Sequence, residues 1–447
     1  MKKNLLIIGI WLLFPLAVQP VWSANEVPNI LLIMADDVGS DAVGCYGGQS
    51  YPTPHIDSLA AEGIRFRHGY SMPVCHPSRI CLLTGRYPFR FGAAGLRWGD
   101  FPKEAEGITI AHRLKQAGYA TAIAGKWQLC MMKDDLKHPN RLGFDEWCLF
   151  GWHEGGRYHN PLIYQNGKRL LNTRDEYGPD LYVQFLTDFM ERQRQAGKPF
   201  FAYYPMALSH DVTNDLKDQY VTFYQDDRWM TYAEMMASMD DRVGRLLAAL
   251  DAMKLKQDTL VLFTTDNGTP KATYLYVDEA GEMVRTPVYS VRHNQVVPGG
   301  KGKLDDTGTR VPLIVRWPGR IKAGETSEVM VDLTDLLPTM AEIAEVQNQD
   351  VPRDGISFAP VLEGRARERS RSWVYTEKKR NDCIRSRDWR LYRDGRCFDL
   401  RNDPKELNPV VREHLSPSAQ DAIAQLQSQL DLMQIDKREV DAPAGVK

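Results

Sequence analysis

The seven cysteines of this 447-residue chain include no C-x-x-C pair, so the usual ligand spacing of a structural zinc site is absent. The net charge is only −2 at neutral pH, which excludes a whole-protein field that would draw the chain to nucleic acid or to an anionic membrane. Internal repeats and low-complexity tracts are missing, and beyond the first residues no run is apolar enough to cross a membrane. Any anionic ligand must therefore be held by a local basic pocket.

The one long apolar run lies at the start, in MKKNLLIIGIWLLFPLAVQPVWSANE. Two lysines precede the run, and Val21-Trp22-Ser23 resembles a small-residue cleavage site. We therefore expect residues 1–24 to form a signal peptide and the protein to be exported, either periplasmic or secreted. An uncleaved membrane anchor is the alternative, but Pro15 interrupts the run and the run is short for a span.

Cysteine pairing is open at this level. Some cysteines of an exported protein could form disulfides, and Cys383 and Cys397 flank a predicted hairpin and could bridge. The odd number of cysteines leaves at least one unpaired or used for something else.

Apolar runs alternate with helical patterns over most of the chain. Runs with strand character cover residues 29–37, 120–127, 199–210, 259–268 and 311–319, and the helical patterns cover 106–118, 177–197, 232–253 and 333–346. Strands that are apolar on both faces and alternate with helices predict an α/β fold, in which helices sandwich a large, mixed, mostly parallel sheet.

The sequence pattern changes near residue 350. Short segments at 372–378, 383–395 and 396–406 predict a small antiparallel sheet, and a helix is expected around 416–434, followed by a polar tail. We therefore expect a catalytic domain over residues 25–350 and a smaller C-terminal α+β subdomain over residues 351–447.

Four of the strand-like runs end in polar side chains, where ligands gather in parallel sheets. These side chains are Asp36, Asp37, Lys126, His210, Asp266 and Asn267. The carboxylates and the amide oxygen form an all-oxygen set that suits calcium or magnesium. The alternative is that each residue only forms a turn or a helix cap, since Asp, Asn and Gly are common in both.

The stretch PVCHPSRICLLTGR carries Cys75 ahead of Pro77 and Arg79. A proline near the start of a helix would place Cys75 at a helix N-terminus, where the dipole favours negative charge. Cys75 could be a nucleophile, a metal ligand, half of a disulfide or a packing residue; Cys81, which lies among aliphatic residues, fits the packing role better. A cysteine protease would combine Cys75 with His210, but that leaves the carboxylates unexplained.

Basic residues accompany these groups. Lys126, in AGKW, and Lys301, in GGKGK, would bind an anion with several oxygens by charge. His210 could act as a general acid near neutral pH. For each of these residues a surface or core position without catalytic function is the alternative.

Taken together, these motifs resemble those of a known family. CHPSRICLLTGR resembles the type I sulfatase signature, C-x-P-S-R followed by x-x-L-L-T-G-R, and ADDVG, GKW, TDNG, GGKG, TRVPLIVRWPG and DLLPTMAEIA follow in the family's order. The resemblance covers nearly the whole chain after the leader and implies an alkaline phosphatase-like fold. It implies that a formylglycine-generating maturation enzyme oxidises Cys75 to Cα-formylglycine.

The resemblance further implies one calcium ion and a set of site residues. The metal ligands would be Asp36, Asp37, Cys75, Asp266 and Asn267, and the catalytic residues would be Cys75, Arg79, Lys126, Gln128, His210 and Lys301. The implied reaction is hydrolysis of sulfate esters, most often those of a sulfated carbohydrate or polysaccharide. Alternatives are a phosphonate or phosphate ester hydrolase of the same superfamily and a catalytically impaired protein that binds sulfated glycans.

Two positions depart from the family pattern. Gln128 stands where the family has a histidine, and an amide cannot accept a proton from the hydrated aldehyde at ordinary pH. DDTGTR, residues 305–310, replaces a more usual glutamate-glycine-glycine. The segment 152–161, the turn at 97–98, Asp211 and His293 are candidates for the substrate pocket, with ordinary polar loops as the alternative.

Overall fold

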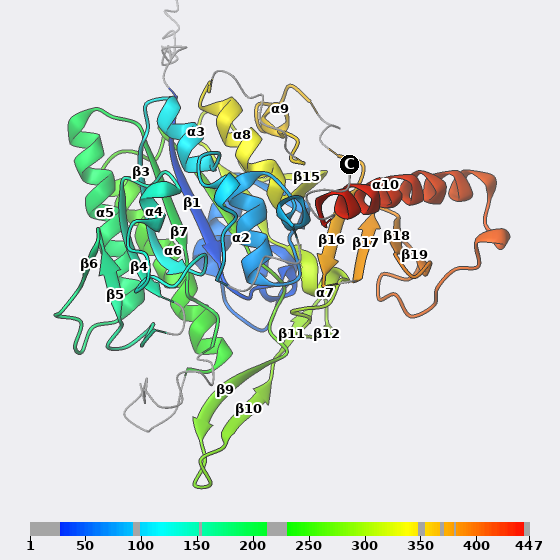
Figure 1. Ribbon diagram of the computed structural model, residues 1–447, viewed down its shortest axis with the longest axis horizontal. Helices are drawn as coiled ribbons and strands as arrows, with labels where there is room; N and C mark the ends of the chain where they lie inside the picture. Colours follow the sequence, from blue (N-terminus) through cyan, green and yellow to red (C-terminus); the bar gives the residue numbers. More distant parts are fainter. Residues whose placement is uncertain are drawn as a thin grey trace, which may run out of the picture.

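The computed structural model describes residues 27–92, 99–151, 154–211, 230–346, 354–366, 371–379 and 381–441 (Figure 1). The predicted signal peptide, residues 1–24, lies outside these ranges. Among the described residues, no helix has the length and apolar character that a membrane crossing requires.

An eleven-stranded sheet forms the centre, in the order β13-β2-β14-β8-β1-β7-β3-β4-β5-β6, with β15 paired to β2. Its strands are β1 (Asn29–Ala35), β2 (Ile64–Tyr70), β3 (Ala120–Trp127), β4 (Glu146–Gly151), β5 (Ile163–Gln165), β6 (Lys168–Arg169), β7 (Phe200–Pro205), β8 (Thr259–Thr265), β13 (Arg310–Val311), β14 (Leu313–Arg316) and β15 (Glu325–Asp332). The central strands β8, β1, β7, β3 and β4 are mutually parallel, whereas β14 runs antiparallel to β8 and β2.

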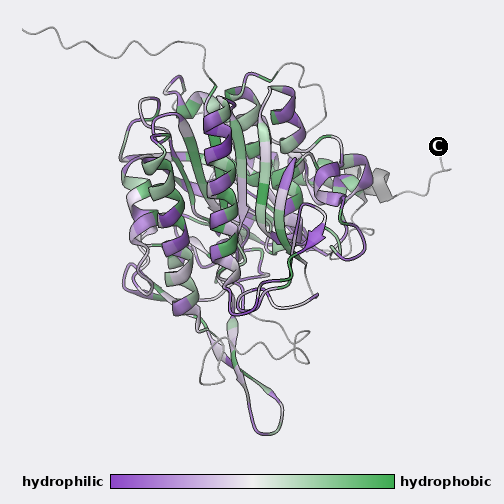
Figure 2. Ribbon diagram, turned by 90° about the vertical axis from the view of Figure 1, so that its left-hand side faces the viewer, coloured by the Kyte–Doolittle hydropathy of each residue, from purple (hydrophilic) through white to green (hydrophobic). Residues whose placement is uncertain are grey.

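Helices cover both faces of this sheet. They are α1 (Pro54–Ala61), α2 (Cys75–Thr84), α3 (Ile110–Gln116), α4 (His138–Arg141), α5 (Gly178–Ala196), α6 (Tyr232–Ala252), α7 (Asp306–Thr309), α8 (Leu336–Ile343) and α9 (Ala359–Leu362). Short 3-10 helices are η1 (Ser40–Ala42), η2 (Gly44–Tyr46), η3 (Pro88–Phe91), η4 (Lys103–Ala105) and η6 (Leu333–Asp335). The helices turn apolar sides toward the sheet and polar sides outward (Figure 2).

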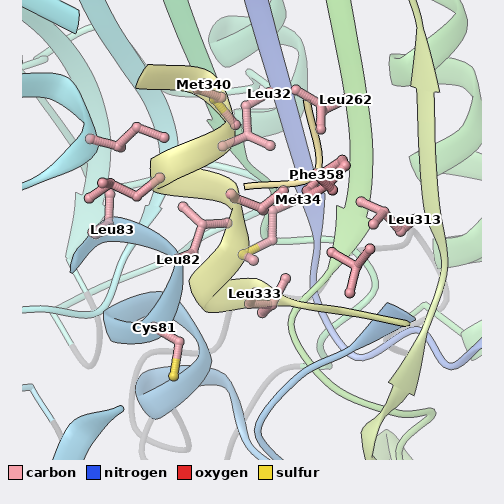
Figure 3. Packing of buried hydrophobic residues seen from close by; sticks show 14 of the residues in the cluster. Leu32, Met34, Cys81, Leu82, Leu83, Leu262, Leu313, Leu333, Met340 and Phe358 are labelled. Carbon is pink, nitrogen blue, oxygen red and sulfur yellow. The ribbon is translucent and has the colours of Figure 1, made fainter. Parts of the chain in front are cut away.

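The alternation of side chains along β1 explains the two cores. Ile30, Leu32 and Met34 pack into one apolar cluster with α2, α3 and α8, whereas Leu31 and Ile33 pack into a second with α1, α5 and α6. Figure 3 shows α8 lying between α2 and the sheet. A strand that is fully apolar can therefore be buried on both faces, as its sequence predicts.

Two ribbons lie at the end of the sheet where the central strands finish. They are β9 (Ala272–Val277) with β10 (Met283–Pro287), and β11 (Tyr289–Arg292) with β12 (Gln295–Pro298). The β9–β10 hairpin projects away from the body of the molecule (Figure 1).

The C-terminal part contains a separate four-stranded antiparallel sheet and a long helix. Its elements are β16 (Val374–Lys378), β17 (Asn381–Arg385), β18 (Trp389–Tyr392), β19 (Cys397–Asp399), η7 (Arg412–His414) and α10 (Pro417–Asp441). Apolar residues of these elements, including Ile384, Leu391 and Leu430, belong to the same cluster as α2 and α8. The division at residue 350 stays a prediction.

The predicted fold class is confirmed, and several details differ. The run at 311–319 is split into β13 and β14 and is antiparallel to its neighbours, and β2, β4 and β15 were not predicted. The suggested Cys383–Cys397 bridge is wrong, because both cysteines are free. They lie on β17 and β19, and β18 lies between these strands. Because neighbouring strands are about 4.8 Å apart, the two Cα atoms are separated by two such spacings, which is too far for a disulfide.

Candidate active site

The carboxyl ends of β1 and β8 bring two aspartates together. Their parallel register places Ala35 opposite Thr265, so Asp36 and Asp266 follow neighbouring strands at the same edge. The backbone N–H of Asp266 donates to the Ala35 carbonyl at 3.2 Å, and the Asp37 N–H donates to Asp266 Oδ1 at 3.1 Å. Both carboxylates are fully buried.

Asp37 completes the loop after β1 in a left-handed conformation, with a φ of 61°. Aspartate tolerates this region better than most residues. Its carboxylate accepts hydrogen bonds from Lys301 Nζ at 2.7 Å and from Asn267 Nδ2 at 2.8 Å. The loops after β1 and β8 are thus joined through side chains as well as backbone.

Helix α2 presents Cys75 to this cluster. Cys75 is the first residue of the helix and is 7% exposed. Pro77 lies near the start of the helix, as predicted, and is its third residue. Its missing N–H is one that would have no intrahelical acceptor. Arg79 lies one turn on, with Nη2 2.7 Å from Asp266 Oδ2 and 3.8 Å from Asp36 Oδ2.

Lys126 reaches the cluster from β3. It lies within the strand rather than after it, is 1% exposed, and its Nζ donates to Asp36 Oδ2. The preceding Gly125 has a φ of 126°, and a Cβ there would lie 2.1 Å from the Pro205 carbonyl oxygen. Only glycine permits this close approach of β3 and β7, which directs Lys126 toward Asp36.

The GGKGK loop supplies Lys301 from the opposite side. The Lys301 N–H donates to the Thr269 carbonyl at 2.9 Å, and the Gly302 N–H donates to the Pro73 carbonyl at 2.8 Å. The loop is therefore fixed between the segment after β8 and the segment that leads to Cys75.

His210 follows β7 at the same edge. Its Nε2 is 3.8 Å from Asp37 Oδ2, and its Nδ1 lies 2.7 Å from the Asp211 carbonyl and 3.3 Å from Arg157 Nη1. The hydroxyl of Tyr158 donates to the backbone carbonyl of His210. Arg157, only 1% exposed, was not singled out from the sequence, because nothing in the segment 152–161 distinguishes it from a surface arginine.

Burial and charge shift the ionisation of these groups in different directions. Burial alone raises the pKa of Asp36, but the positive charges of Lys126, Arg79 and Lys301 outweigh it and lower the pKa below its usual range. Burial and the neighbouring Asp36 raise the pKa of Asp266 to about 7.

The two candidate proton donors are shifted in opposite ways. Burial and the nearby cations, Lys301 first among them, hold the pKa of His210 well below its usual value. The pKa of Lys301 is raised despite burial, because the carboxylate of Asp37 stabilises the ammonium group.

The donor set fits a divalent cation. One carboxylate oxygen of Asp36, one of Asp266 and the Cys75 sulfur lie within 4.8 Å of one another. Asp36 Oδ1 and Asn267 Oδ1 are buried and have no hydrogen-bond partner among the described residues, which is costly unless a cation compensates. Asp37 is not part of this trio, and its two carboxylate oxygens accept hydrogen bonds from Asn267 and Lys301. Oxygen ligands of this kind are those that calcium prefers.

Gln128 follows Lys126 and Trp127 and is 1% exposed. Neither its amide nitrogen nor its amide oxygen has a hydrogen-bond partner in the part of the chain that the structure describes. Its amide nitrogen can still donate a hydrogen bond to a bound molecule, and its amide oxygen can accept one from it.

The candidates for the substrate pocket lie in different parts of the structure, and some fall outside the described residues. His293 lies in the turn between β11 and β12, with its ring close to Gly47. Asp211 lies beside His210 and accepts a hydrogen bond from the Tyr274 N–H at 3.0 Å. Residues 97–98 and 152–153 fall outside the described ranges.

Comparisons with known proteins agree with this geometry. The sulfatase family model matches residues 28–346, and the model of the N-sulphoglucosamine sulphohydrolase C-terminal region matches residues 301–436. N-acetylgalactosamine-6-sulfatase of Sus scrofa is 32% identical over 377 residues, which cover 78% of this chain and 69% of that protein. Arylsulfatase A of Bos taurus is 32% identical over 385 residues, which cover 80% and 71%.

Solved structures share the architecture. The crystal structure of Ps i-CgsB in complex with k-i-k-neocarrahexaose superposes with a TM-score of 0.73 at 25% identity, covering 94% of this chain and 98% of that chain. The family model covers more than half of the chain, and the relatives exceed 30% identity over most of their length. The chain therefore belongs to the sulfatase family, whose members hydrolyse sulfuric esters.

Proposed function

We propose that this protein hydrolyses sulfate esters of a sulfated carbohydrate, with Cys75 matured to Cα-formylglycine and one calcium ion bound beside it. The observation that carries the proposal is the position of Cys75 at the start of α2, within 4.8 Å of carboxylate oxygens of Asp36 and Asp266. The names of similar proteins support a carbohydrate substrate, since they include an N-acetylgalactosamine-6-sulfatase and a complex with a neocarrahexaose.

The charges of the site favour an anionic substrate. Arg79, Lys126 and Lys301 match the carboxylates of Asp36, Asp37 and Asp266 in number. A divalent cation held by Asp36, Asp37, Asp266, Asn267 and the residue at position 75 would supply Lewis-acid stabilisation of charge on the sulfate oxygens. With that cation bound, the site carries a net positive charge, which an anionic ester neutralises.

The residues around position 75 then have distinct tasks. When matured, the residue at position 75 would supply the attacking oxygen through its hydrated aldehyde. Arg79 holds that residue in place from one helical turn away, and Lys126 and Lys301 neutralise the sulfate oxygens as charge develops on them. These groups are fixed by buried contacts before substrate arrives, so little reorganisation is needed.

Proton delivery to the departing sugar oxygen falls to His210 together with Lys301. Lys301 stays protonated, whereas burial and then the surrounding cations keep His210 neutral in the free protein. An anionic ester bound between them would favour the protonated form of His210. Gln128 can hydrogen-bond a hydroxyl at position 75 but cannot remove its proton, so release of sulfate must rely on another base.

The position of this chemistry in the cell follows from the N-terminal pattern. We propose that residues 1–24 direct export to the periplasm or beyond, and that a maturation enzyme modifies Cys75. The catalytic domain over residues 25–350 would act with the C-terminal subdomain over residues 351–447.

The direct test is the mass of the tryptic peptide that carries Cys75, from protein made in its native host. We expect the loss that distinguishes an aldehyde from a thiol, together with release of inorganic sulfate from sulfated oligosaccharides. An aldehyde with turnover of phosphonate esters only would instead identify a phosphonate ester hydrolase. An intact thiol, with tight glycan binding and no sulfate release, would identify a binding protein.

A further inference from the structure

The C-terminal sheet places a lysine against the GGKGK loop, which carries Lys301. Lys378, the last residue of β16, donates from Nζ to the Gly302 carbonyl at 2.7 Å. Gly302 is the neighbour of Lys301, and its N–H bonds the Pro73 carbonyl two residues before Cys75. β17 is held to α7 at the same place, because Arg385 binds Asp306 at 2.9 Å, and the two elements are neighbours in Figure 1.

A second lysine comes from the loop after β8. Lys271 adjoins the GGKGK loop, since a Cβ on Gly299 would lie 2.9 Å from the Lys271 Cα. The Lys271 carbonyl accepts from the Val288 N–H at 3.1 Å, and the Gly299 N–H donates to the Val288 carbonyl at 3.0 Å. This backbone link fixes the spacing between Lys271 and the Lys301 loop.

Lys271, Lys378 and the adjacent Lys379 form what we call the lysine rim. Lys271 and Lys379 are exposed, and Lys378 is half-buried. Burial and then the positive charges of Lys271, Lys379 and Lys301 lower the pKa of Lys378. Lys378 and Lys271 also adjoin the same GGKGK loop, Lys378 through Gly302 and Lys271 through Gly299.

No member of the lysine rim forms an ion pair with a carboxylate within the described ranges. The contrast is with Lys301, which binds Asp37 at 2.7 Å. Nearby carboxylates are directed elsewhere: Asp382 is bound by Arg393, and Glu377 is buried and points to the opposite face of β16 from Lys378. Ammonium groups held close together without counter-charges repel one another, and a multiply charged anion relieves that repulsion.

We propose that the lysine rim is a second anion-binding subsite, which takes a further sulfate or carboxylate group of the glycan whose sulfate ester lies at Cys75. This inference rests on the proposed function and narrows it: the substrate is a glycan with more than one negative charge per binding segment. Lysine suits this task because its ammonium group binds anionic oxygens as a point charge, without the fixed geometry of arginine.

The test measures binding of fluorescently labelled dextran sulfate, carboxymethyl-dextran and plain dextran by anisotropy, using the full chain. The Lys378→Gln/Lys379→Gln double variant is compared with the wild type, with the charge-keeping Lys378→Arg/Lys379→Arg variant and with Lys168→Gln. Lys168 is an exposed lysine on the distant edge strand β6, so it reports non-specific attraction. Melting temperatures of all variants check that each is folded.

We expect the double glutamine variant to raise the Kd for dextran sulfate about fivefold to tenfold at low salt, because each rim lysine contributes a modest, screened attraction. The difference shrinks above about 0.1 M salt, where the Debye length falls to about 10 Å. The arginine variant and Lys168→Gln should bind as the wild type does. A comparable change for carboxymethyl-dextran would show that the subsite also takes carboxylates.

An unchanged Kd in the glutamine variant, or an equal change in Lys168→Gln, would overturn the subsite. Sulfate release measured on the same proteins separates the two proposals. If the wild type releases sulfate but the glutamine variant has an unchanged Kd, the subsite is contradicted and the sulfatase activity is supported. If the glutamine variant binds more weakly but no protein releases sulfate, the subsite is supported and the proposed reaction is contradicted.

Discussion

Replacing Arg79 by methionine should destabilise the protein strongly. The side chain is 3% exposed and lies 2.7 Å from one oxygen of Asp266 and 3.8 Å from one of Asp36. At an effective dielectric constant of about 20 these separations correspond to attractions of roughly 6 and roughly 4 kcal/mol. Desolvation cancels much of this, and removal of one partner from a buried ion pair costs about 3–5 kcal/mol.

The free energy of unfolding is measured by urea titration in EDTA, so that bound metal does not contribute. Arg141→Met is the matched control, because Arg141 also binds two carboxylates, Asp135 and Glu106, but its side chain is 43% exposed. We expect the control to lose less than about 1 kcal/mol.

The loss for Arg79→Met should be larger at pH 8 than at pH 6. The pKa of Asp266 is already raised to about 7 in the intact cluster, and removal of a cation raises it further. Protonation at the lower pH relieves the unpaired charge. A cost below 1 kcal/mol, or one that does not depend on pH, would show that Arg79 does not hold these carboxylates as the geometry indicates.

Other changes test the remaining groups. Calcium at about 100 times its Kd should stabilise the wild type by about 2.7 kcal/mol, seen as a higher melting temperature, and an equal rise in Asp36→Asn would place the ion elsewhere. Burial raises the pKa of Asp211 from 3.8 to about 6, so its contribution falls as pH rises from about 4 to about 6. The free energy of unfolding of Asp211→Asn, relative to that of the wild type, should therefore be higher at pH 7 than at pH 4. An equal difference between the two proteins at both pH values, measured by urea titration, would contradict this. Gln128→His should raise kcat about 100-fold if proton removal at position 75 limits turnover, and an unchanged kcat in steady-state assays of sulfate release would exclude that step.

The sequence was sufficient to predict the central layers of the fold. β1, β3, β7 and β8 are long, apolar and bounded by polar residues, so local pattern and tertiary position agree. β2 was not predicted, because its sequence, IRFRHGY, lacks the continuous apolar run by which the other strands were recognised. It lies near the edge of the sheet. Its identity as a strand depends on pairing with β14 and β15, which are remote in sequence.

The site divides in the same way. Asp36, Lys126, His210 and Asp266 were predicted to lie at one edge of the sheet because parallel strands end at a common edge, and this rule depends only on the strands being parallel. Arg157 and the lysine rim were not predicted. Both depend on how a loop or a second sheet packs against that edge, and this information is spread over many contacts rather than carried by a motif.

The pairing of β2 also orders events during synthesis of the chain. The strand lies immediately before Cys75, and its partners β14 and β15, like the helix α8 that packs on α2, come from residues beyond 310. Until those residues leave the ribosome, the segment around Cys75 lacks the surfaces against which it packs. In the finished molecule Cys75 is 7% exposed. The modification of Cys75 proposed above would thus need access to this residue before those later elements pack around it.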